Sequence, residues 1–315
     1  MLSIIICTYN RCDSLKDVLN SLNSQVSFGS GRVEALVVDN NSNDRTREMV
    51  EETSRDFPIP LRYVFELRQG ISLARNRGVE ESQGDILVFA DDDVILEKDW
   101  VINILDLCQR HHFAAAGGRV LPLYPPDTPD WVLSNRDILR GPVLCHDFGP
   151  EIKPYDKNMD PFVGANLIVL RTTFEEFGLF NTDIVRGQDT MGEDTELFLR
   201  LAKKGKCLIY CGSVCLKHKA DPKRMNLKYL ARWHMRAGCF YAIRHEDESQ
   251  EELACWYGVP RYLFRRLFFS LLGFVPGLFN RRRFLITWNR MFINAGMIQQ
   301  FRRIHIQKKN IYYDL

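Results

Sequence analysis

Short apolar runs that alternate with helix-like segments constrain the fold of this chain most strongly. Four such runs occur in the first 90 residues, and a segment with helical spacing or helix-compatible composition follows each one. The runs are Leu2–Cys7, Val33–Val38, Leu61–Phe65 and Ile86–Ala90, and the helical segments begin near Leu15, Asp44, Ile71 and Asp99. This alternation predicts an α/β domain with a mostly parallel sheet flanked by helices.

The middle of the chain has a less regular pattern. Pro122–Pro129 interrupts the alternation and predicts a surface loop. Beyond it, the predicted strands are Asn166–Leu170, Cys207–Tyr210 and Val214–Leu216, and the predicted helices are Glu193–Lys204 and Asn226–His245. With 315 residues, of which 45% are hydrophobic, the chain is long enough to bury a substantial core.

Polar clusters follow three of the first four strands. They are Thr8-Tyr9-Asn10, Asp39-Asn40-Asn41 and Asp91-Asp92-Asp93. In open α/β sheets the ligand crevice lies beyond the carboxyl ends of the strands. The sequence therefore predicts a ligand site that these three clusters share.

The aspartate triplet is the most informative of these clusters. Three adjacent carboxylates repel one another unless a cation neutralises them. Mg²⁺ and Mn²⁺ prefer carboxylate and phosphate oxygens, so a metal ion that also holds a diphosphate is one interpretation. The other is that Asp91, Asp92 and Asp93 only cap the turn after the strand and face water.

A second acidic cluster, Gly192-Glu193-Asp194, begins a predicted amphipathic helix. Carboxylates at this position are favoured by the helix dipole whether they cap the helix or act in chemistry, so both readings stay open. His218 follows the last predicted strand, where it is either structural or a metal ligand.

Taken together, these segments resemble the large inverting family 2 of glycosyltransferases, whose catalytic domain has the GT-A fold. The resemblance covers roughly the first 245 residues and rests on six elements in a fixed order. They are Ser3–Arg11, Val37–Asp44, Gly70–Gly78, Phe89–Asp93, Phe162–Asn166 and the pair Glu193-Asp194.

The resemblance implies a role for each element. The residues implied to bind the nucleotide-sugar are Thr8, Tyr9, Asn10, Asp39, Arg75, Asn76, Asp91 and Asp92. Those implied to hold a divalent cation, Mn²⁺ or Mg²⁺, are Asp91, Asp93 and His218, with Asp93 as the first choice for direct contact. Gly164, Ala165 and Asn166 would lie on the acceptor side. Asp194 would be the general base, and Glu193 is the alternative.

The end of the chain differs from the rest in charge. From Leu253 to Tyr313 there are eleven Arg and Lys residues and no Asp or Glu. The longest uncharged run, Leu267–Asn280, has 14 residues, whereas a membrane-spanning helix needs about 20. We therefore expect an amphipathic segment that lies on an anionic membrane surface. Nucleic-acid binding is disfavoured because no recognition fold accompanies the charge, and the interleaved aromatic residues argue against a purely solvated helix.

The expected organisation is a GT-A catalytic domain over residues 1–245 and a helical, basic C-terminal region over 246–315. Within the first, residues up to about 120 would bind the nucleotide-sugar, and about 121–245 would form the acceptor side. Nine cysteines without a CxxC pair, and no signal-peptide pattern at the start, predict a cytoplasmic protein peripheral to the inner face of the membrane.

The expected activity is transfer of a sugar from a nucleotide-diphospho-sugar, with UDP favoured by the resemblance, to an acceptor hydroxyl of a surface polysaccharide or glycolipid. Two alternatives stay open. A nucleotidyltransferase has a similar sheet, but it usually carries a glycine-rich loop with Arg after the first strand, which Thr8-Tyr9-Asn10 is not. A protein that binds nucleotide-sugars without catalysis is the other.

Overall fold

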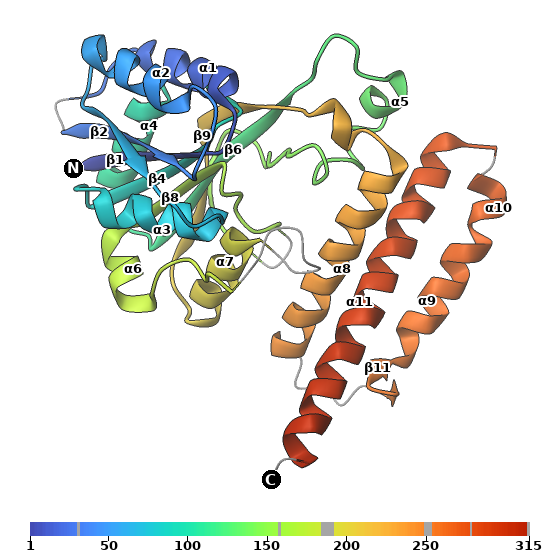
Figure 1. The fold of residues 1–315 in the computed structure, drawn as a ribbon. Helices are drawn as coiled ribbons and strands as arrows, with labels where there is room; N and C mark the ends of the chain where they lie inside the picture. The colour runs from blue at the N-terminus through green and yellow to red at the C-terminus, as the bar shows by residue number, and fades with distance from the viewer. Residues whose placement is uncertain (30–31, 157–158, 184–191, 249–253, 278, 314–315) are drawn as a thin grey trace. The chain divides into compact units, whose positions relative to one another are not determined.

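A computed structural model describes residues 1–29, 32–156, 159–183, 192–248, 254–277 and 279–313. The chain divides into two compact units. As far as the structure describes them, the first contains residues 1–124, 144–183 and 192–220, and the second contains residues 125–143 and 221–313. Figure 1 shows the helices and strands of both units.

The first unit is built on a nine-stranded sheet with the order β3-β2-β1-β4-β8-β6-β9-β5, and β7 pairs with β9. The strands are β1 (Leu2–Thr8), β2 (Val33–Asp39), β3 (Leu61–Phe65), β4 (Ile86–Asp91), β5 (Val94–Leu96), β6 (Ala115–Leu123), β7 (Ile152–Pro154), β8 (Asn166–Leu170) and β9 (Leu208–Lys219). The first four predicted strands are confirmed as β1 to β4, and Asn166–Leu170 is confirmed as β8.

Pairing within the sheet places the polar clusters at one edge. Strand β1 pairs in parallel with β2 and β4, and β2 pairs in parallel with β3. Parallel strands have their carboxyl ends on the same side, so the turns after β1, β2 and β4 lie together. Strand β8 then runs antiparallel to β4 and β6, whereas β6 and β9 are parallel to each other.

Helices cover both faces of this sheet (Figure 1). They are α1 (Cys12–Asn23), α2 (Thr46–Thr53), η1 (Ser54–Asp56), α3 (Ile71–Glu81), α4 (Trp100–Arg110), α6 (Arg171–Phe177) and α7 (Glu193–Lys203). Side chains of β1 alternate between two cores: Ile4 and Ile6 pack with α1, α2 and α4, whereas Ile5 packs with α3, α6 and α7. Burial on both faces explains why this strand is apolar throughout.

Two predictions in the middle of the chain are wrong in detail. The predicted strands Cys207–Tyr210 and Val214–Leu216 are parts of the single strand β9, which has an irregular register opposite Gly118 and Arg119. The predicted loop begins too early, because β6 continues through Pro122 to Leu123. Strands β5 and β6 are absent from the predicted elements.

The second unit is mostly helical. Its elements are α5 (Asp130–Leu133), η2 (Pro222–Arg224), α8 (Leu227–Glu248), β10 (Cys255–Trp256), β11 (Val259–Pro260), α9 (Arg261–Leu272), α10 (Phe274–Gly277) and α11 (Arg281–Tyr313). Helix α11 packs along both α8 and α9 (Figure 1). Their shared core contains Ala242, Val259, Leu263, Met297 and Phe301. The predicted helical C-terminal region is confirmed.

The segment that contains α5 belongs to this unit. The guanidinium of Arg282, at the start of α11, pairs with the carboxylate of Asp137 at 2.8 Å, and the Asn289 amide donates to the carbonyl of Ile138 at 3.2 Å. The side chains of Lys308 and Lys309, two of the basic residues counted above, lie outside the described part of the structure. No helix in the part of the chain that the structure describes is long and apolar enough to cross a membrane.

Candidate active site

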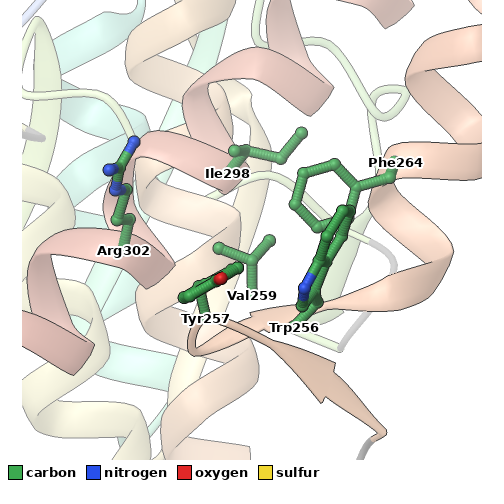
Figure 2. Close-up of a pocket in the computed structure, with 6 residues that line it drawn as sticks. All are labelled: Trp256, Tyr257, Val259, Phe264, Ile298 and Arg302. Atoms are coloured by element: carbon green, nitrogen blue, oxygen red, sulfur yellow. The ribbon is translucent and has the colours of Figure 1, made fainter.

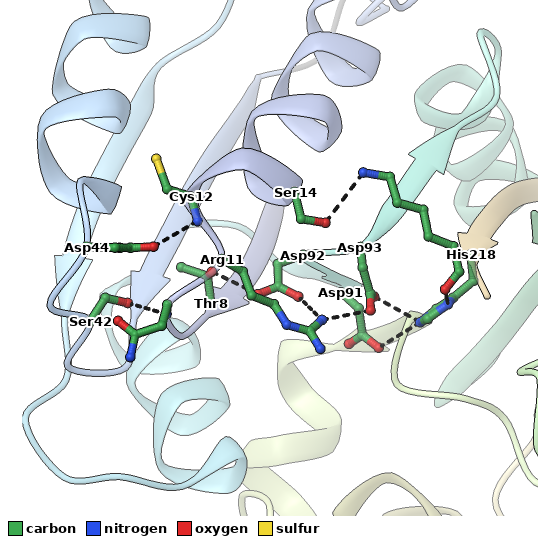
Figure 3. Close-up of polar contacts among 12 residues, drawn as sticks. Thr8, Arg11, Cys12, Ser14, Ser42, Asp44, Asp91, Asp92, Asp93 and His218 are labelled. Atoms are coloured by element: carbon green, nitrogen blue, oxygen red, sulfur yellow. Dashed lines mark hydrogen bonds and ion pairs between the residues drawn. The ribbon is translucent and has the colours of Figure 1, made fainter. Parts of the chain in front are cut away.

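The turn between β4 and β5 brings together the three residues predicted as metal ligands. Strand β4 ends at Asp91, and the next two residues, Asp92 and Asp93, form the turn. Strand β5 then pairs with β9, so that Val94 lies opposite His218. Atom Nε2 of His218 lies 2.9 Å from Oδ1 of Asp93 and 3.8 Å from Oδ2 of Asp91 (Figure 3). The three possible ligand atoms lie within 4.8 Å of one another, close enough for one ion to contact all three.

The orientation of the His218 ring suits a metal ligand. Its Nδ1 lies 3.0 Å from the carbonyl oxygen of Lys219 (Figure 3). A carbonyl oxygen only accepts, so Nδ1 must carry the hydrogen in this contact. The protonated ring donates from Nε2 to Asp93, and in the neutral ring that binds a metal the lone pair would be on Nε2, the nitrogen that faces the two carboxylates. A backbone carbonyl that fixes the ring in this way is the usual second partner of a metal-binding histidine.

Asp92 has different neighbours from the other two aspartates. Its Oδ2 accepts a 2.8 Å hydrogen bond from the Thr8 hydroxyl, and its Oδ1 accepts one of 3.0 Å from Arg11 (Figure 3). Burial raises the pKa of Asp92 to about 6, although Arg11 and Thr8 favour its ionised form. Asp92 therefore connects the turn after β4 to the turn after β1 and lies outside the group of three ligand atoms.

Arg11 also contacts Asp93, through a 2.7 Å hydrogen bond to Oδ2. Burial by itself would raise the pKa of Asp93, but the His218 hydrogen bond and charge, together with Arg11, outweigh it and lower the pKa to about 2. No role for Arg11 follows from the motifs alone, although it ends the first of them. The signal that points to it is a cation in the turn after one strand, in a chain with an aspartate triplet after a neighbouring strand.

A buried ion pair connects the metal-ligand group to helix α7. Arg75, on α3, donates a 2.5 Å hydrogen bond from Nη1 to Oε1 of Glu193, and its Nη2 lies 3.4 Å from Oδ1 of Asp91. The side chains of Arg75 and Glu193 are only 3% and 4% exposed. The guanidinium of Arg75 thus holds two acidic residues of the site together, and its predicted contact with the nucleotide-sugar stays a prediction.

Asp194 is held in a different way from Glu193. It is half-buried in the first turn of α7, where its Oδ2 accepts a 2.8 Å hydrogen bond from the Gly164 backbone N–H. Its Oδ1 accepts one of 2.7 Å from the backbone N–H of Thr195. Carboxylate oxygens have further lone pairs, so Asp194 can still accept a proton from a ligand.

Gly164 lies where Arg75 and Asp194 approach each other. A Cβ atom at this position would be 2.2 Å from Nη2 of Arg75, so any side chain would displace the buried guanidinium. The predicted acceptor-side residue is therefore required by the packing of the charged network. This requirement is independent of whether Gly164 contacts an acceptor.

The predicted nucleoside-side residues lie in the turns after β1 and β2. Tyr9 is 49% exposed, and Asn10 has a left-handed backbone with φ of 50°. The Asn10 side chain accepts from the backbone N–H of Asn43 at 2.8 Å, which joins the two turns. Asp39 is buried, and its carboxylate accepts from the Tyr63 hydroxyl at 2.7 Å and from a backbone N–H of the turn after β2.

Three predicted site residues have their side chains in the protein interior. The Asn76 amide exchanges two hydrogen bonds, of 2.9 and 3.0 Å, with the backbone of Phe180. Ala165 and Asn166 are fully buried, and the Asn166 amide bonds to the Trp100 indole and to two backbone carbonyls. These side chains are buried, and the contacts with donor or acceptor predicted for them stay predictions.

Known proteins share the motifs and the fold of this chain. A family model described as glycosyl transferase family 2 matches residues 3–172, which is more than half of the chain. The chain belongs to glycosyltransferase family 2. The resemblance inferred from the motifs is thereby confirmed, and of the two enzyme classes left open by the sequence it is the glycosyltransferase that is supported.

Curated relatives of this family 2 chain include two bacterial proteins that match most of it. The succinoglycan biosynthesis protein ExoM of Rhizobium meliloti is 26% identical over 239 residues, which cover 75% of this chain and 72% of ExoM. The uncharacterized glycosyltransferase YfnE of Bacillus subtilis is 26% identical over 276 residues, covering 72% of this chain and 69% of YfnE.

Solved structures of glycosyltransferases confirm the GT-A fold. The mannosyltransferase PcManGT from Pyrobaculum calidifontis, in complex with GDP-Man and Mn²⁺, matches with a TM-score of 0.61 and 18% identity, covering 95% of this chain and 86% of that one. Residues 1–349 of S. aureus TarS in complex with UDP match with a TM-score of 0.54 and 15% identity, covering 98% and 91%.

Proposed function

We propose that this family 2 glycosyltransferase is metal-dependent and inverts the configuration of the sugar that it transfers from a nucleotide-diphospho-sugar to an acceptor hydroxyl. The observation that carries the proposal is the convergence of Asp91, Asp93 and His218 within 4.8 Å on the sheet edge that Arg75 connects to α7. This arrangement combines a cation site for a diphosphate with a carboxylate able to accept a proton.

The donor set fits a divalent cation. Two carboxylates and one imidazole suit Mn²⁺, which accepts oxygen and nitrogen ligands, and the carboxylates alone suit Mg²⁺. When bound, the ion would stabilise the negative charge that gathers on the leaving diphosphate. Asp91, Asp93 and His218 would hold it, while Arg11 and Thr8 position Asp92 beside them.

Asp194 is the proposed general base. Glu193 is buried and paired with Arg75, whereas Asp194 is half-buried at the helix start. Its carboxylate would take the proton of the acceptor hydroxyl as that oxygen bonds to the anomeric carbon. The bond from the anomeric carbon to the diphosphate oxygen breaks with its electron pair on the diphosphate. Attack from the opposite face inverts the carbon and requires no covalent enzyme intermediate.

The donor and acceptor classes come from the relatives and the site together. TarS binds UDP and PcManGT binds GDP-Man with Mn²⁺ in their structures, and ExoM is a succinoglycan biosynthesis protein. For this chain we propose a UDP-sugar donor and an acceptor in surface polysaccharide or glycolipid biosynthesis. Tyr9, Asn10 and Asp39 would lie on the nucleoside side.

We also propose that the enzyme works at the cytoplasmic face of the membrane, bound through its basic C-terminal helices. Supporting this, the stretch from Leu253 to Tyr313 carries no acidic residue. Large apolar side chains are also exposed on α9 and after it: Phe268, Phe269, Leu271, Leu272 and Phe279.

The decisive experiment compares Asp194→Asn with the wild-type enzyme. Thermal-shift screening against UDP-, GDP- and dTDP-sugars with Mn²⁺ first identifies the donor, because a specific ligand stabilises the folded state. Transfer from that donor should then fall by about 10²–10⁴-fold in Asp194→Asn, the range of general-base catalysis, while donor binding is retained.

Asp106→Asn is the matched control for this experiment. Asp106 is half-buried on α4, far along the sequence from the site residues, and among the described residues it pairs only with Arg110 one helical turn away. This variant should transfer sugar at the wild-type rate. Transfer at the wild-type rate by Asp194→Asn would overturn the assignment of the base. Loss of donor binding in the same variant would show that Asp194 contributes to binding the donor and not to the chemical step.

A further inference from the structure

A tight hairpin in the second unit holds two aromatic side chains out to solvent. Strands β10 and β11 pair antiparallel and are joined by Tyr257 and Gly258, both with positive φ (49° and 75°). Two-residue turns of this kind favour Asn, Asp or Gly, so a tyrosine at the first position is strained. Strain of this kind is retained where surrounding structure enforces it, and it often marks a functional element.

Helix α11 enforces the shape of this hairpin. A Cβ atom on Gly258 would lie 2.2 Å from the ring of His305, so only glycine allows the turn to pack this closely. As a result, Trp256 is 58% exposed and Tyr257 is 77% exposed. Exposed aromatic side chains contribute hydrophobic free energy only when an apolar partner removes their surface from water.

The hairpin forms one wall of an apolar groove of about 280 Å³ against α9 and α11. Trp256 and Phe264 lie at one end, with their ring centroids 5.6 Å apart, and Arg302 lies at the other (Figure 2). The remaining lining residues are Tyr257, Val259 and Ile298. The groove is slightly smaller than typical small-molecule pockets of roughly 300–1,000 Å³, so it would hold part of a chain-like ligand.

One end of the groove is cationic. Arg302 is exposed and lines this end, and among the described residues no carboxylate pairs with it. No Asp or Glu occurs between Leu253 and Tyr313, although five acidic residues precede this stretch in the sequence: Glu246, Asp247, Glu248, Glu251 and Glu252. A single cation at the end of an apolar groove complements a ligand with an apolar chain and one anionic group.

We propose that this groove binds an anionic membrane phospholipid, with part of an acyl chain against Trp256, Phe264 and Ile298 and the phosphate beside Arg302. Trp and Tyr are enriched at bilayer interfaces, where an apolar body and a polar tip are both satisfied. A second copy of the chain is a poorer occupant, because two such basic surfaces repel each other. The proposal rests on the membrane attachment proposed above and gives it a specific site.

Fluorescence quenching by brominated lipids tests the groove directly. The full-length enzyme is mixed with vesicles of phosphatidylcholine and phosphatidylglycerol whose acyl chains carry bromine. The signal of Trp256 is taken as the difference between wild type and Trp256→Phe. We expect this difference signal to be quenched by brominated phosphatidylglycerol, and much less by vesicles of phosphatidylcholine alone.

A charge-matched pair of variants tests the role of Arg302. Arg302→Gln and Arg290→Gln remove the same charge from the same helix, and Arg290 is exposed but does not line the groove. Loss of one basic residue near an anionic surface weakens binding by about five-fold. We expect the vesicle partition coefficient of Arg302→Gln to be about five-fold lower than that of Arg290→Gln, because only Arg302 would contact the phosphate. Both variants should unfold at the wild-type temperature.

The possible outcomes distinguish lipid binding in the groove from membrane attachment through the basic helices in general. If vesicles bind the enzyme but Trp256 is not quenched and the two arginine variants behave alike, the groove proposal is wrong and general charge attraction explains the attachment. If no anionic vesicle binds, both proposals fail. If Trp256→Phe instead abolishes self-association seen by sedimentation, the groove is an interface between copies. None of these results depends on the sugar-transfer activity.

Discussion

The guanidinium of Arg75 donates a 2.5 Å hydrogen bond to the carboxylate of Glu193, across 118 residues of sequence and with both side chains almost fully buried. This contact distinguishes the two adjacent acids that begin α7. Glu193 neutralises a buried cation, and Asp194 remains half-buried and able to receive a proton. Two adjacent acids in the first turn of one helix therefore differ in burial and in their partners.

Removing Arg75 should strongly destabilise the first unit. Arg75→Met leaves the Glu193 carboxylate buried without its cation, and breaking a buried pair in this way typically costs about 3–5 kcal/mol. Urea denaturation followed by circular dichroism measures the loss in the free energy of unfolding.

Arg110→Met is the control for that measurement. Arg110 pairs with Asp106 one helical turn away on α4, and the side chain of Arg110 is 72% exposed. Pairs on the exposed surface contribute little to stability, so this variant should remain close to wild type. Equal losses for the two variants would contradict the structural role given to the Arg75 pair.

Replacing His218 should weaken metal binding. His218→Asn removes the nitrogen that faces Asp91 and Asp93, so we expect the affinity for Mn²⁺ to fall by at least about ten-fold. Electron paramagnetic resonance of free Mn²⁺ reports this affinity without any need for turnover. His111→Asn, at an exposed position after α4, should leave it unchanged. Unaltered Mn²⁺ affinity in His218→Asn would remove this residue from the metal site.

Acid should destabilise the second unit through His234. Burial lowers the pKa of His234 to about 4 from an unfolded value near 6.5, although its hydrogen bond to the Leu230 carbonyl opposes this. Between these two values the unfolded chain binds more protons than the folded one, so stability falls as the pH decreases. A shift of this size corresponds to about 3 kcal/mol, present above pH 6.5 and lost by pH 4.

Comparison with His234→Gln isolates this contribution. All other groups titrate in both proteins, so the difference between their free energies of unfolding should change by about 3 kcal/mol from pH 7 to pH 4, with wild type losing more. Chemical denaturation at a series of pH values measures the difference. A pH-independent difference would show that His234 is not held neutral by burial.

The sequence determined the nucleotide side of the fold. Strands β1 to β4 are mostly apolar because both faces of the sheet are covered, and this local pattern can be recognised in the sequence. The polar turns after β1, β2 and β4 follow from the same pattern. Parallel pairing places them on one edge, so the position of the aspartate triplet in the site was also predictable.

Tertiary structure decided the elements whose local sequence is unfavourable. Strand β6 contains Gly117 and Gly118, which are poor strand formers, yet a Cβ on Gly118 would lie 2.1 Å from the Asn166 amide. Glycine is therefore needed at position 118 to leave room for Asn166, and β6 forms through its pairing with β8 and β9. The pairing of β5 with β9, which places His218 beside the aspartates, likewise depends on partners more than 100 residues apart.

The same distinction applies to the charged residues. From the sequence, Asp91, Asp93, His218 and the Glu193-Asp194 pair could be named as candidates, because their residue types suit a metal ion and a base. The structure adds their partners: Thr8 and Arg11 contact Asp92, and Arg75 pairs with the buried Glu193. It also brings Arg11 into the site, where it contacts Asp93. Residue type and periodicity are local properties, whereas the cost of burying a charge depends on which distant groups surround it.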